Sequence, residues 1–142
     1  MSSLVVLEDV ERADRLAGKA AFDLLRYRGY LALMPGRVVY IPTRKTHPAI
    51  ESEDLMTSRV EAGVPLEVAI PLLRDEETAR TIQPEGDTLV LVDDDARTVS
   101  TRLFPLACDV VMSDGALHRF FCGPFVARKI RKALKSGRPS DA

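Results

Sequence analysis

Apolar residues follow a helical spacing near the start of this chain. From residue 10 to about residue 28 they recur every three or four positions, as on one face of a helix. They are Val10, Ala13, Ala17, Ala20, Leu24 and Tyr27. Asp9 is a suitable N-cap and Gly29 a suitable stop. The pattern therefore predicts an N-terminal helix of about five turns.

Two other regions carry the shorter rhythm of β-hairpins. Residues 30–34 and 37–41 are apolar runs around Pro35-Gly36, which suits the centre of a type II turn. Further on, short apolar runs are separated by turn residues, and Asp114-Gly115 is a strong signal for a two-residue hairpin turn. The sequence therefore predicts an antiparallel sheet built from hairpins at about residues 30–41 and 88–122.

The remaining segments are helical in pattern. Residues 49–62 and 66–82 predict a central helical pair, and Pro71 should kink or split the second segment. After Gly123-Pro124 a helix is expected to about Lys135, with a stripe of Val126, Ile130 and Leu134. We expect a single α+β domain at residues 1–136, with helices on the core face of the sheet and a flexible tail at 137–142.

The register of the last hairpin decides which side chains meet. A two-residue turn at Asp114-Gly115 pairs Cys108 with Phe121 and places Asp109 and His118 on one face. It also places Cys108 and Cys122 on opposite faces, which argues against a disulfide. Asp109 and His118 are the one catalytic candidate, and a plain cross-strand polar pair is the alternative.

Other chemistry is not indicated by the residue pattern. No serine or thiol nucleophile is clearly placed beside Asp109 and His118, so we expect a protein that is not an enzyme. His47 has no second histidine or cysteine at ligand spacing, and Asp93-Asp94-Asp95 lacks the pattern of a calcium loop. We therefore expect no metal and no cofactor.

Charge is sorted along the chain. The net charge is +3 over residues 1–50, −10 over 51–95 and +6 over 96–142, which sums to −1. Such sorting predicts an acidic surface from 51–95 and a basic surface from 97–138 that bind a partner. The expected binding residues are Arg44, Lys45, Arg128, Lys129, Arg131, Lys132 and Lys135. The expected apolar contact residues are Phe120, Phe121 and Phe125.

These patterns predict a non-enzymatic interaction or assembly subunit that binds itself, as a homo-oligomer or larger assembly, or another protein. The alternative is a nucleic-acid-binding regulator that uses the basic C-terminal helix, with a helix-turn-helix at 64–82. Residues 36–83 are faintly similar to the Mor/C group of phage transcription activators, but the acidic start of the second helix departs from a DNA-reading helix, and no residue roles are taken from it. No apolar run is long enough to span a membrane and no secretory signal is present, so the expected location is the cytoplasm.

Overall fold

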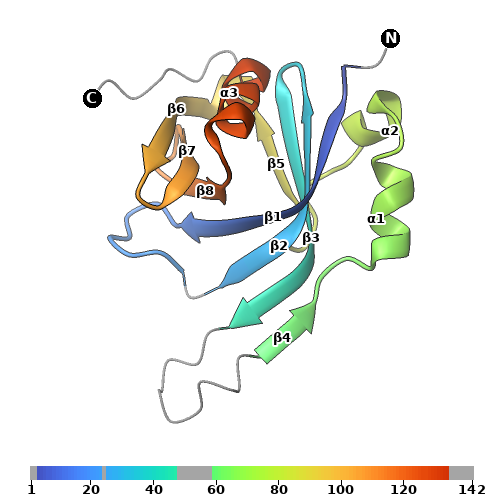
Figure 1. The fold of residues 1–142 in the computed structure, drawn as a ribbon, viewed down its shortest axis with the longest axis horizontal. Coiled ribbons are helices and arrows are strands. Elements are labelled where there is room, and N and C mark those ends of the chain that lie inside the picture. Colours follow the sequence, from blue (N-terminus) through green and yellow to red (C-terminus); the bar gives the residue numbers. More distant parts are fainter. Residues whose placement is uncertain (1–2, 24, 48–58, 135–142) are drawn as a thin grey trace.

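The computed structural model describes residues 3–23, 25–47 and 59–134, which form a broadly α+β fold (Figure 1). Within them one antiparallel sheet contains eight strands, and three α-helices accompany it. The strands are β1 (Val5–Arg15), β2 (Arg26–Met34), β3 (Arg37–His47), β4 (Arg59–Ala62), β5 (Leu89–Val92), β6 (Ala96–Leu103), β7 (Leu106–Met112) and β8 (Leu117–Phe121). The helices are α1 (Leu66–Leu72), α2 (Glu76–Arg80) and α3 (Pro124–Ala133).

The sheet curls around an interior that α3 covers. Its strand order is β4-β3-β2-β1-β8-β7-β6, and β5 pairs with β3 off this path. Helix α3 contacts β6 and β7 near one end of the order and also β2 and β3 near the other, so the sheet must bend back on itself (Figure 1). The rings of Tyr40 on β3 and Phe120 on β8 meet across this interior, with centroids 5.9 Å apart.

Strands β2 and β3 are buried on both faces over residues 31–34 and 38–41. The interior core includes Leu31, Leu33, Val38, Tyr40, Leu91, Val99, Val110, Phe120, Ile130 and Leu134. A second core lies on the other face of the same two strands, under α1 and α2, and consists of Ala32, Met34, Val39, Ile41, Ala69, Leu73, Ala79 and Ile82. Double-sided burial explains why both strands are continuous apolar runs rather than alternating ones.

The predicted N-terminal helix is wrong, because residues 5–15 and 26–34 are strands joined by a loop. β1 pairs with β2 on one side and with β8 on the other. Two features hide its period-two pattern: a buried position is occupied by the charged Arg12, and the register shifts between Leu7 and Val10, where Asp9 has a φ of 57°. Hydrogen bonds to β2 and β8 along both edges stabilise these residues as a strand, although the spacing of the alanines weakly favours a helix.

The central helical region differs in part. Of the predicted helix at 49–62, residues 59–62 form strand β4, which pairs with β3, and residues 49–58 lie outside the described residues. The segment 66–82 is split as Pro71 suggested, but the break comes after Leu72. Asp75 then begins α2 as an N-cap, its side chain accepting a hydrogen bond from the Thr78 amide at 2.8 Å.

The hairpin turn between β2 and β3 is confirmed, whereas the register between β7 and β8 is wrong by one residue. Gly36 has the φ of 79° that a type II turn requires. In the later hairpin, the Met112 amide donates to the Ala116 carbonyl at 2.8 Å, so the loop contains three residues rather than two. Gly115, with a φ of 95°, closes that loop, and Cys108 is opposite Phe120.

This one-residue difference reverses every face assignment in β8. Asp109 is now opposite Arg119, and the neighbouring His118 points to the other face. The predicted Asp109–His118 pair is therefore wrong. Cys122 shares a face with Phe120 and packs against the core that contains Cys108, so the two cysteines are not on opposite faces as expected; both are free thiols.

Candidate interaction surfaces

Helix α1 exposes three large apolar side chains. It buries Ala69 against β2 and β3, while Leu66, Val68 and Ile70 are each about half exposed. We call these three residues the α1 face, of which Leu66 and Ile70 share one side of the helix because they are four residues apart; Glu67 is the acidic residue of the first turn. Folded proteins rarely leave neighbouring large apolar side chains uncovered without a reason, so the α1 face is a candidate contact surface.

Acidic side chains accompany the α1 face. Asp75 and Glu77 are exposed at the start of α2, the next helix along the chain. Glu76 is engaged, because it forms an ion pair with Arg80 at 2.9 Å and accepts a hydrogen bond from the Ser3 amide. Arg74 and Arg80 are also exposed, so residues 66–80 carry a net charge of −2. The α1 face therefore has an acidic surrounding.

A second apolar surface is the turn between β6 and β7. We call Leu103, Phe104, Pro105 and Leu106 the hairpin tip. Phe104 is 90 % exposed, Leu103 is 69 % exposed and Leu106 is 46 % exposed. An aromatic side chain stabilises a protein mainly through the apolar area that it buries. The exposed ring of Phe104 buries little area in the monomer and so contributes little to its stability.

Exposed basic side chains of α3 lie near the turn between β2 and β3, where Lys129 and Lys132 line a hollow of about 330 Å³ with Ser3, Val5, Leu33, Met34, Pro35 and Ala133. Helix α3 packs against β6 and β7 and exposes Arg128, Lys129 and Lys132. Among the described residues, no ion pair joins these three to an acidic side chain. Phe125 on the first turn of α3 is 76 % exposed, with the Arg128 guanidinium 5.9 Å from its ring centre.

The two surfaces lie on opposite sides of the molecule. In Figure 1, α1 and α2 are at the right, while the β6–β7 hairpin is at the left with α3 above it. The acidic segment is nevertheless divided by the fold. Asp87 pairs with Lys45, and Asp93 adjoins Gly36, whose amide donates to the Ala133 carbonyl of α3. Among the described residues, the acidic side chains of α1 and α2 are Glu67, Asp75, Glu76 and Glu77.

The expected contact residues are distributed unevenly. Phe120 is fully buried in the interior core, so a partner cannot reach it, and Phe121 is half-buried beside Arg26. Arg44 is exposed on β3, while Lys45 is engaged by Asp87. Arg131 is half-buried, with its Nη2 3.5 Å from the Thr101 hydroxyl, and Lys135 lies outside the described residues. Phe125, Arg128, Lys129 and Lys132 remain available.

The α1 face and the hairpin tip were missed by the sequence reasoning. The signal for the tip is present in the chain: Leu103-Phe104-Pro105-Leu106 is apolar at a turn, where polar residues are usual. The signal for α1 is a seven-residue helix of sequence LEVAIPL, in which apolar residues occupy more than one face.

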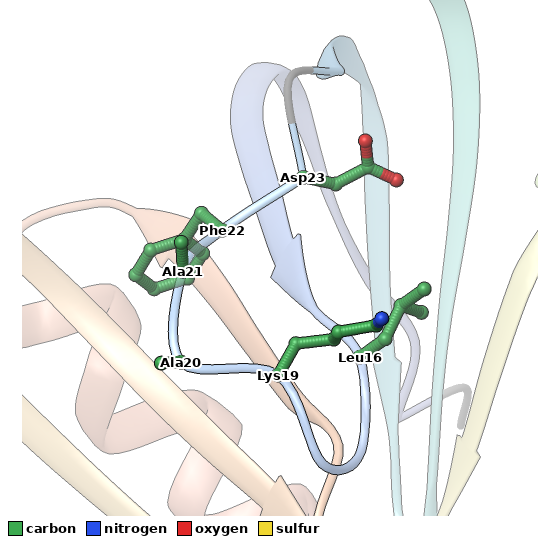
Figure 2. Close-up of a pocket in the computed structure, with 6 residues that line it drawn as sticks. All are labelled: Leu16, Lys19, Ala20, Ala21, Phe22 and Asp23. Atoms are coloured by element: carbon green, nitrogen blue, oxygen red, sulfur yellow. The ribbon is translucent and has the colours of Figure 1, made fainter.

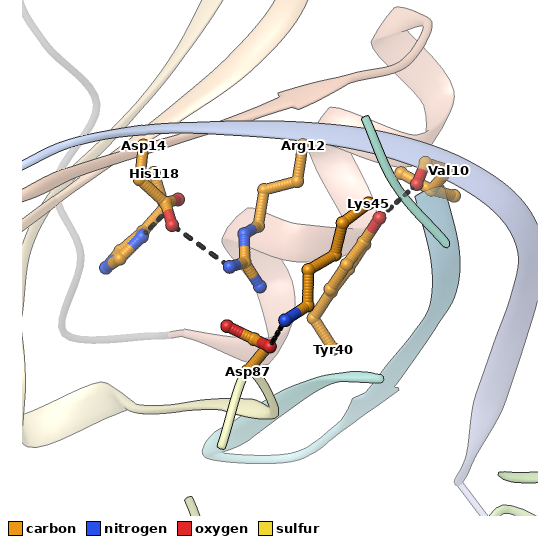
Figure 3. A network of polar contacts seen from close by, with 7 residues as sticks. All are labelled: Val10, Arg12, Asp14, Tyr40, Lys45, Asp87 and His118. Carbon is orange, nitrogen blue, oxygen red and sulfur yellow. Dashed lines mark hydrogen bonds and ion pairs between the residues drawn. The ribbon is translucent and has the colours of Figure 1, made fainter. Parts of the chain in front are cut away.

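A buried polar network surrounds Arg12 (Figure 3). Arg12 is 3 % exposed, and its guanidinium carbon lies 4.2 Å and 4.7 Å from the ring centres of Tyr27 and Tyr40. Its Nη2 donates to Asp14 at 3.0 Å, and Asp14 is 2.8 Å from Nδ1 of His118. The Tyr40 hydroxyl donates to the Val10 carbonyl. These contacts tie β1, β2, β3 and β8 together.

Asp109 is held in a separate ion-pair group. Arg119 donates to both of its carboxylate oxygens, at 2.7 Å and 3.0 Å, and Arg102 lies 3.5 Å away. The Arg119 guanidinium also stacks 4.4 Å from the Phe22 ring centre. This bidentate arrangement fixes Asp109 and leaves His118 to Asp14, so neither residue is arranged to activate a nucleophile.

The loop between β1 and β2 surrounds an open hollow of about 460 Å³ (Figure 2). Its lining residues are Leu16, Lys19, Ala20, Ala21, Phe22 and Asp23. These six include no histidine, cysteine or hydroxyl side chain. Across the described part of the chain, no three His, Cys, Asp or Glu side chains come close enough together to hold a metal ion.

Both thiols are expected to react slowly. Burial raises the pKa of Cys108 to about 12 and that of Cys122 to about 11. Because the thiolate is the reactive form, iodoacetamide at pH 8 should modify the native protein at least about a hundredfold more slowly than a free cysteine. Mass spectrometry of timed samples measures this, and protein unfolded in guanidinium is the control. Rapid single labelling of the native chain would contradict the burial of these thiols.

Comparison with known proteins gives no relative for this chain: no family model, no curated protein and no solved structure matches it. None of the helices in the described ranges is long and apolar enough to cross a membrane. The two surfaces themselves are therefore the basis for inferring a function.

Proposed function

We propose that this protein is a non-enzymatic interaction or assembly subunit that docks on protein partners through the α1 face and the hairpin tip. The observation that carries this proposal is the exposure of large apolar side chains at two places, on α1 and at the hairpin tip. Apolar contacts supply affinity, while the surrounding charge supplies orientation and fast encounter. Phe104 is the expected anchor, because exposed aromatic side chains are frequent hot spots.

A photo-crosslinking amino acid at position 104 or 70 tests this proposal in extract from the source cells. Both positions are exposed in the structure, so substitution leaves the core intact. We expect each to yield protein-crosslinked products at several times the amount from position 8, an exposed site on β1 away from both surfaces. The readout is the mass shift on a denaturing gel. Products no more abundant than at position 8 would refute the proposal.

A second candidate is nucleic-acid binding through α3, because Arg128, Lys129 and Lys132 are exposed and unpaired among the described residues. Lysine and arginine contacts to phosphates would make such binding steeply dependent on salt. The same experiment separates the two candidates when the crosslinker is also placed at position 129. Products that disappear after nuclease treatment would favour nucleic acid over protein.

A further inference from the structure

We propose that this protein binds a small amphipathic carboxylate, that is, a carboxylate group on an apolar chain, in the hollow between α3 and the β2–β3 turn. The hollow has a volume of about 330 Å³, and its lining residues come from the start of β1, the end of β2, the turn itself and the second half of α3. Figure 1 shows α3 beside this hairpin, and the helix contacts both strands. The inference goes beyond the proposed function, because it uses neither the α1 face nor the hairpin tip.

The walls of the hollow are apolar and firmly held. Leu33 belongs to the interior core and Met34 to the second core, so the lining cannot rearrange without disturbing both cores. Ala133 lines the side formed by α3, and its carbonyl accepts a hydrogen bond from the Gly36 amide at 2.7 Å, which joins the helix to the turn. The hollow is therefore formed before a ligand arrives, and this lowers the cost of binding.

Two lysines supply the charge of the hollow. Lys129 and Lys132 are three residues apart on α3, so their side chains are neighbours, and both line the hollow. Both are exposed, and within residues 3–23, 25–47 and 59–134 neither forms an ion pair. Like charges at this spacing repel each other, and an anion bound between them would relieve that repulsion.

Other charged groups around the β2–β3 turn offset one another. Glu76, whose carboxylate accepts from the Ser3 amide, is paired with Arg80 at 2.9 Å. Asp93 lies beside Gly36, and the positive charge of the adjacent Arg37 offsets it. The charge of the two lysines is therefore not cancelled by these groups, and the hollow favours a negatively charged ligand.

The ligand must match both the charge and the walls. An inorganic anion such as phosphate would contact the lysines but leave the apolar walls in water, and a neutral hydrocarbon would leave the two charges unmatched. A nucleoside or a peptide brings many hydrogen-bonding groups, whereas Ser3 is the only polar lining residue besides the lysines. A carboxylate on an apolar chain fits both features, since its oxygens accept hydrogen bonds from the ammonium groups and its chain covers Val5 and Leu33.

Titration of the full chain with hexanoate, octanoate and decanoate, followed by heteronuclear NMR, tests the site directly. The amide signals of Val5, Leu33 and Ala133 should shift, with a dissociation constant of about 1 mM for decanoate. Affinity should rise about threefold or more for each added methylene, because each one buries further apolar area. Octan-1-ol, which has no charge, and acetate, which has no chain, should each bind at least about tenfold more weakly than octanoate.

Charge variants of α3 test the role of the lysines. Lys129→Gln and Lys132→Gln should each weaken octanoate binding about threefold to fivefold, and the double variant should weaken it about tenfold. Arg128→Gln is the matched control, since it removes one charge from an exposed position of the same helix that does not line the hollow. Its affinity for octanoate should stay within about twofold of the unmodified chain. Circular dichroism checks that every variant remains folded.

The inference fails if about 10 mM decanoate causes no shift, or if the shifts centre on Phe104 rather than on Val5. Equal affinity for octan-1-ol and octanoate would exclude the lysines from the contact, and equal affinity for phosphate and octanoate would exclude the apolar walls; either result overturns it. If the double variant keeps its affinity for octanoate but loses affinity for a DNA oligonucleotide, the lysines contact phosphates instead. That result would overturn the inference and support the second candidate function.

Discussion

Replacing Gly29 with alanine is expected to lower the free energy of unfolding by about 3 kcal/mol or more. A Cβ atom at this position would lie 2.1 Å from the Ile41 carbonyl oxygen and 2.7 Å from the Pro42 Cα. Both obstacles are backbone atoms of the neighbouring strand, so no side-chain rotation can relieve the overlap. Strands β2 and β3 would have to separate, and both cores depend on them.

The site is demanding because the register between β2 and β3 shifts at this glycine, where Thr43 is the extra residue. Chemical denaturation with a fluorescence or circular dichroism readout measures the effect. Gly123→Ala is the control, since a Cβ added there would have nothing within 4 Å and the φ of Gly123 is −76°. A Gly29→Ala protein that unfolds at the same denaturant concentration as this control would contradict the close approach.

Replacing Asp14 with alanine is expected to destabilise the protein by about 3–5 kcal/mol, because it leaves a buried guanidinium without its counter-charge. Arg12 is almost fully enclosed, and its Nε and Nη1 already have no hydrogen-bond partner among the described residues. Asp14 is also the partner of His118, so the substitution removes the link between β1 and β8 on that face. Glu8→Ala, an exposed acidic residue on the same strand, should change stability by less than about 0.5 kcal/mol.

The acid dependence of stability provides a second readout of the same residue. Burial acts to raise the pKa of Asp14, but the hydrogen bond with His118 and the charge of Arg12 outweigh it, so its pKa lies below the usual 3.8. A lowered pKa in the folded state contributes stability above about pH 4 that is lost as the pH falls through the folded value. The difference in unfolding free energy between the unmodified chain and Asp14→Asn should therefore become smaller as the pH falls. A difference that is constant from pH 7 to pH 2 would contradict this.

Local signals predicted the parts of the fold that depend on neighbouring residues. The type II turn at Pro35-Gly36 is set by the two turn residues themselves, and the apolar stripe of the last helix by its own spacing: Ile130 and Leu134 are buried and Val126 is partly so. Strand β7 begins and ends at the expected residues. In each case the deciding interactions are within a few residues in sequence.

The errors arise where distant residues decide. β1 is a strand because β2 and β8 hydrogen-bond to its two edges, and neither partner is visible in the spacing of its alanines. Arg12 further disguises it, since a charge at a buried position is explained only when Tyr27, Tyr40 and Asp14 surround it. The register predicted for the last hairpin depends on the length of its loop. Because the loop has one more residue than expected, Asp109 and His118 lie on opposite faces.

The exposure of the expected contact residues was predicted only in part. The basic face of α3 follows directly from its sequence, and Arg128, Lys129 and Lys132 are exposed as its spacing indicates. Phe120 could not be distinguished from Phe125 by composition, because burial depends on the curl of the sheet rather than on the residue type. The exposed apolar residues of the tip and of α1 required the structure, since sequence hydrophobicity alone assigns such residues to a core.

The pairing of β1 with β8 also orders events during synthesis. His118 follows Asp14 by 104 residues, so a growing chain must display the β1 edge unpaired until β8 has been made. An uncovered strand edge is a template for pairing with other chains, and contacts between such distant positions form slowly. The nascent protein is therefore most prone to misassembly before β8 has been synthesised. Pairing of β1 with β8 covers the exposed strand edge and ends this period.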